Sequence, residues 1–190
     1  MLCLQHITGT LPQQLGQLSL LEQFEISVNQ VSGIIPTEFG QLKALRFLQL
    51  AIDNFESIPY ELGQLESLEF LALWNNFQLN GTIPSELGEL YNCTTLQLHG
   101  CALHGTIPSE LGKLTKLTEI TLNNNQLHGP IPSSLGMLTQ LTKLNIQEND
   151  LSGTVPDDIC SISSLPDISI DCLSVACPED CNCLCEDPLL

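Results

Sequence analysis

Basic residues are scarce in this 190-residue chain, which has 5 lysines and arginines against 22 aspartates and glutamates and a formal net charge of −17. The five cations form no cluster; they are Lys43, Arg46, Lys113, Lys116 and Lys143. Nucleic-acid binding depends on grouped cations that neutralise phosphates. We therefore expect no nucleic-acid partner.

Long apolar runs are missing as well. No segment approaches the roughly 18 consecutive apolar residues that a membrane-spanning helix needs. The first ten residues, "MLCLQHITGT", lack the charged and apolar regions of a secretory signal. The sequence thus predicts no membrane insertion and no signal peptide within this chain.

The usual signatures of catalysis and metal binding are absent too. No serine stands in a G-x-S-x-G turn, and there is no phosphate loop and no EF-hand spacing. The histidines are His6, His99, His104 and His128. Although His104 and His128 fall at equivalent positions one repeat apart, no Asp, Glu or Cys is placed to complete a catalytic or metal-binding set. We predict a non-catalytic protein with no cofactor and no metal site.

What the chain does contain is an internal repeat. "GTIPSELG" occurs at residues 81–88 and again at 105–112. The prolines of this step recur every 23 to 25 residues, at Pro12, Pro36, Pro59, Pro84, Pro108, Pro132 and Pro156. One full copy reads L-x-x-I-x-L-x-x-N-x-L-x-G-x-I-P-x-x-L-G-x-L, a period and pattern typical of leucine-rich repeats. Each coil of such an array buries its apolar face only against a similar neighbour, which explains the near-verbatim copying.

With its G-x-I-P step, the chain resembles the plant-type extracellular leucine-rich repeat family, as found in receptor-kinase ectodomains, receptor-like proteins and polygalacturonase inhibitors. The resemblance covers residues 1–171. It implies an α/β-type solenoid, a right-handed coil with a parallel β-sheet on its concave face and a cysteine-rich C-terminal cap. We expect about seven repeats of 24 residues in 1–171, the first of them truncated, and the cap in 172–190.

Positions within the repeat predict which side chains point inward. Asn125 is expected to bond free backbone groups of the adjacent coil, and Asn29, Asn76 and Asn149 hold the same place. Asp53 and Cys101 substitute there and are interpreted as local variations of this ladder. The first repeat begins inside its own strand, so we expect either an N-terminally truncated form or a neighbour that covers this uncapped coil.

Two adjacent repeats are irregular. "DNFESIP" is one residue short and lacks the glycine, whereas "NNFQLNGTIP" carries one residue extra. The return path is expected to deform there, either as tolerated drift or as a binding edge.

The register places outward side chains of successive strands in columns on the concave face. Four large apolar residues fall on two neighbouring strands, and their rings are expected to touch. These residues are Phe47, Ile52, Phe70 and Trp74, and the polar residues around them are Glu25, Gln49, Gln97 and His99. Such a patch is typical of a protein-binding hot spot or of a platform for sugar rings, and its alternative is a cluster that only stiffens the sheet.

Six of the nine cysteines lie near the C-terminus, at Cys160, Cys172, Cys177, Cys181, Cys183 and Cys185. In a segment with few apolar residues they predict three disulfides and an oxidising compartment, with connectivity open among fifteen patterns. A soft-metal site is the alternative. The acidic, cysteine-rich tail resembles those of algal, diatom-like repeat proteins. Cys93 and Cys101 lie too far apart along one strand to bridge and are predicted free thiols.

Two N-glycosylation sequons, Asn80-Gly-Thr and Asn92-Cys-Thr, favour a secreted or cell-surface protein. Both asparagines are expected to project from the return path, away from the strands.

Together these features predict a recognition module that binds a protein, peptide or glycan on its concave sheet. An inhibitor of a secreted wall-degrading enzyme would use the same face. The other alternative is a structural, adhesion or assembly subunit that acts through its ends.

Overall fold

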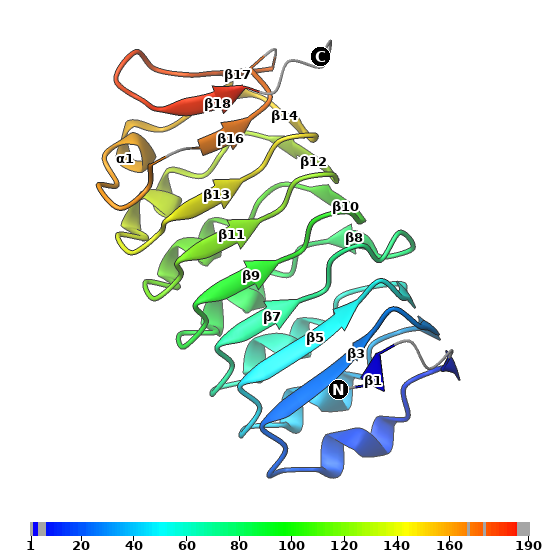
Figure 1. Ribbon diagram of the computed structural model, residues 1–190. Coiled ribbons are helices and arrows are strands. Elements are labelled where there is room, and N and C mark those ends of the chain that lie inside the picture. Colours follow the sequence, from blue (N-terminus) through cyan, green and yellow to red (C-terminus); the bar gives the residue numbers. More distant parts are fainter. Residues whose placement is uncertain (1, 4–6, 167, 173, 186–190) are drawn as a thin grey trace.

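The computed structural model describes residues 2–3, 7–166, 168–172 and 174–185 (Figure 1). Met1, Leu4, His6 and the last residues of the cysteine-rich tail lie outside this described part. The chain winds as a solenoid in which each coil supplies one strand to a shared face and returns behind it (Figure 1).

The main sheet has nine parallel strands in sequence order. They are β1 (Leu2–Cys3), β3 (Gln23–Ser27), β5 (Phe47–Ala51), β7 (Phe70–Ala72), β9 (Thr95–Gln97), β11 (Glu119–Thr121), β13 (Lys143–Asn145), β16 (Ile168–Ile170) and β18 (Cys183–Cys185). Leu2 and Cys3 pair with Ile26 and Ser27, so the truncated first strand has the register that the sequence predicts. The α/β-type leucine-rich repeat solenoid is confirmed.

The return segments are mostly 3₁₀ helices rather than α-helices. They are η1 (Gln13–Gln17), η2 (Thr37–Gln41), η3 (Tyr60–Gln64), η4 (Ser85–Glu89), η5 (Ser109–Lys113) and η6 (Ser133–Met137), followed by the short helix α1 (Asp157–Cys160). The proline of each repeat immediately precedes the helix; Pro84, for example, has φ −62°. Because the proline ring fixes φ near this value, every coil turns into its helix at the same point.

A second set of short strands lies between the end of each main-sheet strand and the next proline. Each of these strands pairs with its equivalent in a neighbouring coil. One sheet contains β2 (Thr8–Gly9), β4 (Gln30–Gly33) and β6 (Asn54–Phe55), and another contains β8 (Asn80–Thr82), β10 (Ala102–Gly105), β12 (Gln126–Gly129) and β14 (Asp150–Leu151). β6 and β8 do not pair, although the Asn80 backbone N–H donates to the Glu56 carbonyl at 3.0 Å. The break coincides with the missing glycine and the extra residue, so the expected deformation of the return path is confirmed.

The core is a column of leucine and isoleucine side chains. In one coil Leu117, Ile120, Leu122, Leu127, Ile131, Leu135 and Leu138 are all buried, as the repeat pattern predicts. The coils approach one another closely at the glycine of the P-x-x-L-G step. A Cβ added to Gly40 would lie 2.6 Å from the Glu61 carbonyl oxygen, so this position is restricted to glycine by the next coil.

The predicted hydrogen bonds of the repeated asparagine are confirmed. We call the row formed by Asn29, Asn76, Asn125 and Asn149 the asparagine ladder. The side-chain amide of Asn125 donates to the carbonyls of Leu98 and Leu122, both at 2.9 Å, and its oxygen accepts the Leu103 N–H at 3.0 Å. Each ladder asparagine thus joins neighbouring coils through buried backbone groups. The Cys101 thiol replaces the amide donor with a contact of 3.4 Å to the Leu73 carbonyl.

Three disulfides close the C-terminal end: Cys160–Cys181, Cys172–Cys185 and Cys177–Cys183, with Cα–Cα distances of 4.9, 5.5 and 6.2 Å. The predicted disulfide cap is therefore confirmed. Its last strand, β18, pairs with β16 and covers the edge of the main sheet. The remaining pair of the cap is β15 (Gly153–Thr154) with β17 (Val175–Ala176).

Candidate partner-binding face

The candidate face is the outward side of the main-sheet strands. Residues of one column pair directly across the sheet: Gln23, Phe47, Phe70, Thr95, Glu119 and Lys143 are in register, as are Glu25, Gln49, Ala72, Gln97, Thr121 and Asn145. The columns predicted from the repeat are confirmed for these strands. Between them, inward residues such as Leu48 and Leu71 are fully buried, which fixes the direction of the outward ones.

Phe47 and Phe70 form a stacked pair near the start of their strands. Their ring centroids are 4.5 Å apart and the rings are nearly parallel, at 6°. Both residues are half-buried, because each ring covers one face of the other. The predicted contact between these two rings is confirmed.

Trp74 does not join that pair. It stacks instead on His99 of the next coil, with centroids 5.6 Å apart and an interplanar angle of 2°. His99 Nδ1 lies 3.0 Å from Thr121 Oγ1, which holds the imidazole plane parallel to the indole. Burial, followed by the positive charge of Lys143, lowers the pKa of His99 below its ordinary value and so favours the neutral imidazole.

The rings expected to form one cluster are thus arranged as two pairs on one face. Phe70 and Trp74 are four residues apart on the same coil, a separation of about 13 Å at the rise of an extended strand. The column of Gln49, Ala72 and Gln97 lies between the pairs. Because Ala72 is fully buried, the floor between the two pairs is low.

The glutamines on this floor are held by neighbouring side chains. Gln49 Nε2 donates to Ser27 Oγ at 3.3 Å and lies 3.5 Å from Glu25 Oε1. Gln97 Nε2 donates to Glu119 Oε1 at 3.1 Å, and the same oxygen accepts from Lys143 Nζ at 3.0 Å. The polar positions around the ring pairs are therefore already oriented by the protein.

Ile52 follows β5 and adopts a left-handed backbone, with φ 56°. The residue at this place is left-handed in six coils: Val28, Ile52, Asn75, Gly100, Asn124 and Glu148. Glycine and asparagine adopt that conformation readily, whereas a β-branched residue there is strained. Val28 is also 39% exposed, so neither packing nor backbone preference accounts for a valine at this position. Such strain is found preferentially at functional sites.

All five cations already have partners within the chain. Four form ion pairs with Glu66, Glu69, Glu89 and Glu119, and Lys116 Nζ bonds Asn92 Oδ1 at 2.7 Å. These pairs are solvent-exposed and contribute little to stability. They leave most carboxylates of the described chain without a cationic neighbour, so the surface of the solenoid is strongly negative.

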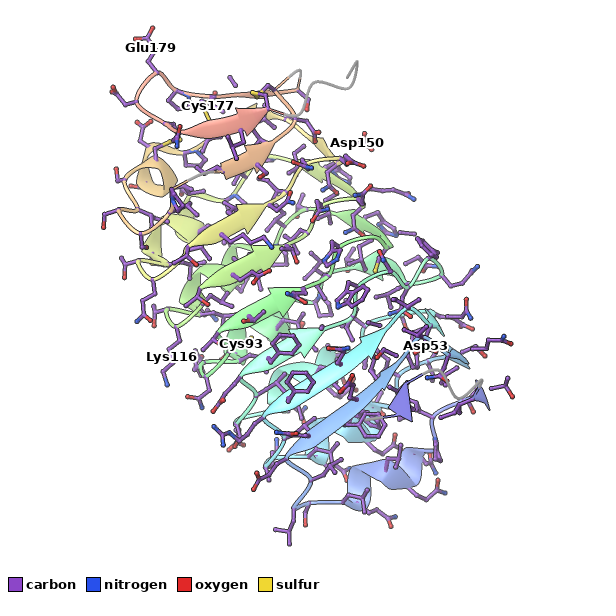
Figure 2. All side chains as sticks on the ribbon, viewed as in Figure 1. Asp53, Cys93, Lys116, Asp150, Cys177 and Glu179 are labelled. Carbon is purple, nitrogen blue, oxygen red and sulfur yellow. A yellow bond between two sulfur atoms is a disulfide. The ribbon has the colours of Figure 1, made fainter. Side chains whose placement is uncertain are left out.

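Cysteine chemistry at the cap favours disulfides over metal. Within the described residues, the only group with metal-ligand geometry is Cys177, Cys181 and Cys183, and all three sulfurs are already disulfide-bonded. Cys93 and Cys101 are free thiols, as predicted, and burial raises their pKa to about 12 and about 11. A nucleophilic or metal-binding thiol needs a lowered pKa, so neither is suited to that chemistry. Figure 2 locates Cys93, Cys177 and Asp53 on the solenoid.

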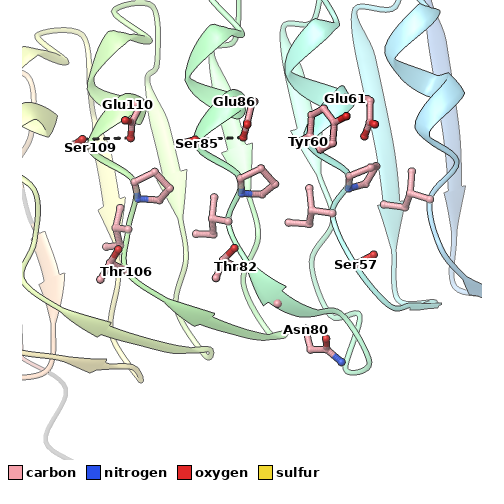
Figure 3. Close-up of a pocket in the computed structure, with 18 of the residues that line it drawn as sticks. Ser57, Tyr60, Glu61, Asn80, Thr82, Ser85, Glu86, Thr106, Ser109 and Glu110 are labelled. Atoms are coloured by element: carbon pink, nitrogen blue, oxygen red, sulfur yellow. Dashed lines mark hydrogen bonds between the residues drawn. The ribbon is translucent and has the colours of Figure 1, made fainter.

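The sequence did not predict a groove on the flank of the solenoid. A hollow of about 1040 Å³ runs across the isoleucine-proline steps of several coils, lined by rows that include Ser57, Thr82 and Thr106 and, on the opposite rim, Glu61, Glu86 and Glu110 (Figure 3). A smaller hollow of about 790 Å³ adjoins it, and Asn80 lines both. The only signal in the sequence was the pair of irregular repeats at this place.

Comparison with known proteins agrees with this architecture. Residues 92–114, 116–138 and 140–162 match the family described as Leucine Rich Repeat. No curated protein matches the sequence. The solved structures that resemble the chain include the ectodomain of the plant membrane receptor kinase GASSHO1/SCHENGEN3 from Arabidopsis thaliana, in complex with CASPARIAN STRIP INTEGRITY FACTOR 2. That ectodomain shares 36% identity with a TM-score of 0.85 over 91% of this chain and 21% of the receptor chain.

Two further structures show the range of the fold. The plant peptide hormone receptor RGFR1, in complex with RGF2, shares 36% identity with a TM-score of 0.83 over 85% of this chain and 26% of its own. A plant ice-binding protein shares 25% identity with a TM-score of 0.65 over 84% of this chain and 66% of its own. This chain therefore spans about a quarter or less of the lengths of the two receptor chains.

The fold and its disulfide cap define an extracellular-type solenoid built for an oxidising compartment. The chain belongs to the leucine-rich repeat family, of the plant-type extracellular class that is also found in receptor ectodomains. Within the described residues no helix has the length and apolar content to cross a membrane.

Proposed function

We propose that this chain is a non-catalytic recognition module, secreted or displayed at the cell surface, that binds a protein or peptide partner on its concave face. The observation that carries the proposal is the two stacked ring pairs, Phe47 with Phe70 and Trp74 with His99, on one outward face. Aromatic anchors of this kind dominate the binding energy of protein interfaces. The similar receptors GASSHO1/SCHENGEN3 and RGFR1 were solved in complex with a partner, which supports the same class of role here.

The ligand would cross several coils. One ring pair is on β5 and β7, and the other is on the coils of β7 and β9 but about 13 Å further along the strand direction, so an extended segment laid diagonally across the strands meets both. The strained Ile52, which follows β5, supports an apolar contact beside them. The excess of carboxylates supports a partner with basic side chains near its anchors.

The test is capture of partners from the source tissue, followed by measurement of Kd for the partner identified. The triple variant Phe47→Ala, Phe70→Ala, Trp74→Ala is compared with wild type. The matched control is Tyr60→Ala with Tyr91→Ala, because both tyrosines are exposed off the strand face, at 57% and 53%. Circular dichroism and thermal unfolding establish that all three proteins are folded.

Each lost anchor is expected to cost more than about 1 kcal/mol, so the triple variant should lose at least two orders of magnitude in affinity. The control should bind as wild type. Equal binding by the triple variant would contradict the concave face as the site and favour a scaffold that acts through its ends. A glycan recovered in place of a protein would overturn the partner class while leaving the face intact.

A further inference from the structure

We propose that Asn80 alone carries an N-linked glycan, that Asn92 remains unmodified, and that the flank groove beside Asn80 seats the first sugars. The inference rests on the extracellular setting proposed above. It arises from a contrast between two sequons that look equivalent in the sequence.

The Asn80 sequon is open in every position. Asn80 and Thr82 are exposed, and among the described residues neither side chain makes a hydrogen bond or an ion pair. The middle residue, Gly81, has φ +90° and open space where a Cβ would project. A glycan attached to Asn80 before folding therefore displaces no contact of the folded protein.

In the Asn92 sequon, by contrast, every side chain is either hydrogen-bonded or buried. Asn92 Nδ2, the atom that would be glycosylated, donates to the Glu66 carbonyl at 2.8 Å, and Asn92 Oδ1 accepts from Lys116 Nζ at 2.7 Å. The Thr94 hydroxyl donates to the Glu69 carbonyl at 3.0 Å, and Cys93 between them is fully buried. A sugar on Nδ2 would lie against the Glu66 carbonyl and Lys116, so a chain modified here before folding would have to break these contacts between coils, each at a cost typical of a lost hydrogen bond.

The position of Asn80 makes the flank groove the seat of its glycan. Asn80 lines both hollows and lies at the lower margin of the close-up, so a chain attached to it starts at the edge of the groove (Figure 3). The walls offer hydroxyl and carboxylate groups from Thr106, Glu61 and Tyr60, which match the donors and acceptors of a sugar. The Pro84 ring and the Tyr60 ring supply carbon surface for the apolar faces of sugar rings.

A glycan at this place also has a structural use. β8 is the outer strand of its four-stranded sheet, because β6 does not pair with it. Exposed edge strands tend to pair with other chains, and natural proteins cover them. β8 lies behind β7 (Figure 1), so a glycan there covers an edge and leaves the concave face open.

The modification forms one bond and breaks one. Asn80 Nδ2 bonds the anomeric carbon of an oligosaccharide carried on a lipid pyrophosphate. The bond from that carbon to the pyrophosphate oxygen breaks and its electron pair leaves with the pyrophosphate, while Nδ2 gives up one proton. No oxidant or reductant is involved.

The experiment expresses residues 1–190 behind a secretion leader in a eukaryotic cell that attaches N-glycans, and measures intact mass before and after amidase release. We expect one glycan on wild type, none on Asn80→Gln, and one on Asn92→Gln. Peptide mapping should find the aspartate left by release at position 80. A glycan on Asn92, glycans on both asparagines, or none on wild type would overturn the assignment.

The proposal that the flank groove holds the first sugars is tested on the same material, by measuring the rate at which an exomannosidase trims the glycan of the folded protein. Tyr60→Ala should speed trimming several-fold over wild type, whereas Tyr91→Ala, an equally exposed tyrosine outside the groove, should not. Equal rates for all three proteins would overturn the seat. Neither variant alters the ring pairs, so failure of the concave-face proposal and failure of this one are distinguishable.

Discussion

Asp53 and Asn76 occupy equivalent positions in consecutive coils, but only Asn76 can both donate and accept the hydrogen bonds that join neighbouring coils. Asn76 Nδ2 donates to the Leu73 carbonyl at 2.9 Å and to the Leu50 carbonyl at 2.6 Å, while its oxygen accepts the Phe55 N–H at 3.4 Å. Asp53 Oδ1 accepts the Val31 N–H at 3.1 Å, but Asp53 Oδ2 is buried without a partner. An ionised carboxylate has no proton to donate, so the coil of Asp53 lacks the hydrogen bonds that Asn76, in the next coil, donates to backbone carbonyls.

Asp53 should make the stability of the protein depend on pH. Burial raises the pKa of Asp53 to about 6, against the nearby backbone N–H groups of Val31 and Asn29, which lower it. The folded state therefore holds this proton more tightly than the unfolded state, in which the carboxyl has its ordinary pKa of 3.8. The stabilisation of the folded state that comes from protonated Asp53 is fully present below the pKa of the unfolded chain and is lost as pH rises through the pKa of the folded protein. Urea unfolding should show this loss between roughly pH 4 and pH 6.

Asp53→Asn should remove that loss and stabilise the protein at pH 7 by on the order of 1 to 3 kcal/mol. Urea unfolding of wild type and variant at pH 5 and pH 7.5 measures it, and the difference between the two proteins cancels the other carboxylates. The reciprocal control, Asn76→Asp, should introduce the same penalty in the next coil. Parallel pH profiles for wild type and Asp53→Asn would contradict this account.

Ile52→Asn should raise stability while weakening partner binding. Asparagine relieves a left-handed strain of about 1 to 2 kcal/mol, and it already occupies the same place at Asn75 and Asn124. The converse change, Asn124→Ile, should lower the melting temperature without affecting the proposed site. Should Ile52→Asn prove destabilising and bind normally, Ile52 would be a packing residue rather than part of the interface.

Gly40→Ala should destabilise the protein by several kcal/mol, because the new Cβ would lie 2.6 Å from the Glu61 carbonyl oxygen of the next coil. Gly9→Ala is the informative comparison, since nothing lies within 4 Å of its added Cβ and its cost comes only from a positive φ of 95°. Chemical denaturation of both variants separates intercoil crowding from backbone strain. A smaller loss for Gly40→Ala than for Gly9→Ala would argue against close coil contact.

Cys93 should resist alkylation in the folded protein. Its thiol is fully buried, and burial raises its pKa to about 12, so almost no reactive thiolate forms at pH 8. Iodoacetamide treatment followed by peptide mass mapping should find Cys93 unlabelled in the native chain and labelled after denaturation. Half-buried Cys101 serves as the internal comparison, and labelling of native Cys93 at the rate of a free peptide thiol would contradict the burial.

Periodicity predicted most of the fold because each position of the repeat has one environment. The register of Phe47 with Phe70, the role of Asn125 and the number of cap disulfides all follow from local spacing. The pairing of the six cap cysteines does not, since chain spacing leaves fifteen possible patterns and three-dimensional proximity selects one. From the sequence, Trp74 is placed among the apolar residues of the patch and His99 among the polar residues around it, so the stacking of the two is not predicted. The left-handed turn at Ile52 runs against the preference of its own side chain, so no propensity argument finds it.

The unpaired flank between β6 and β8 gives the solenoid a place of low stiffness. Elsewhere, successive coils are fastened along two edges, by the main sheet and by the flank strands, whereas here the second fastening is reduced to the bond between Asn80 and Glu56. Bending or stretching load should concentrate at this junction, with the strand face acting as the hinge and the flank opening. The same junction carries the Phe47 and Phe70 pair on its other side, so a partner gripping those rings would hold the two halves of the array at a fixed angle.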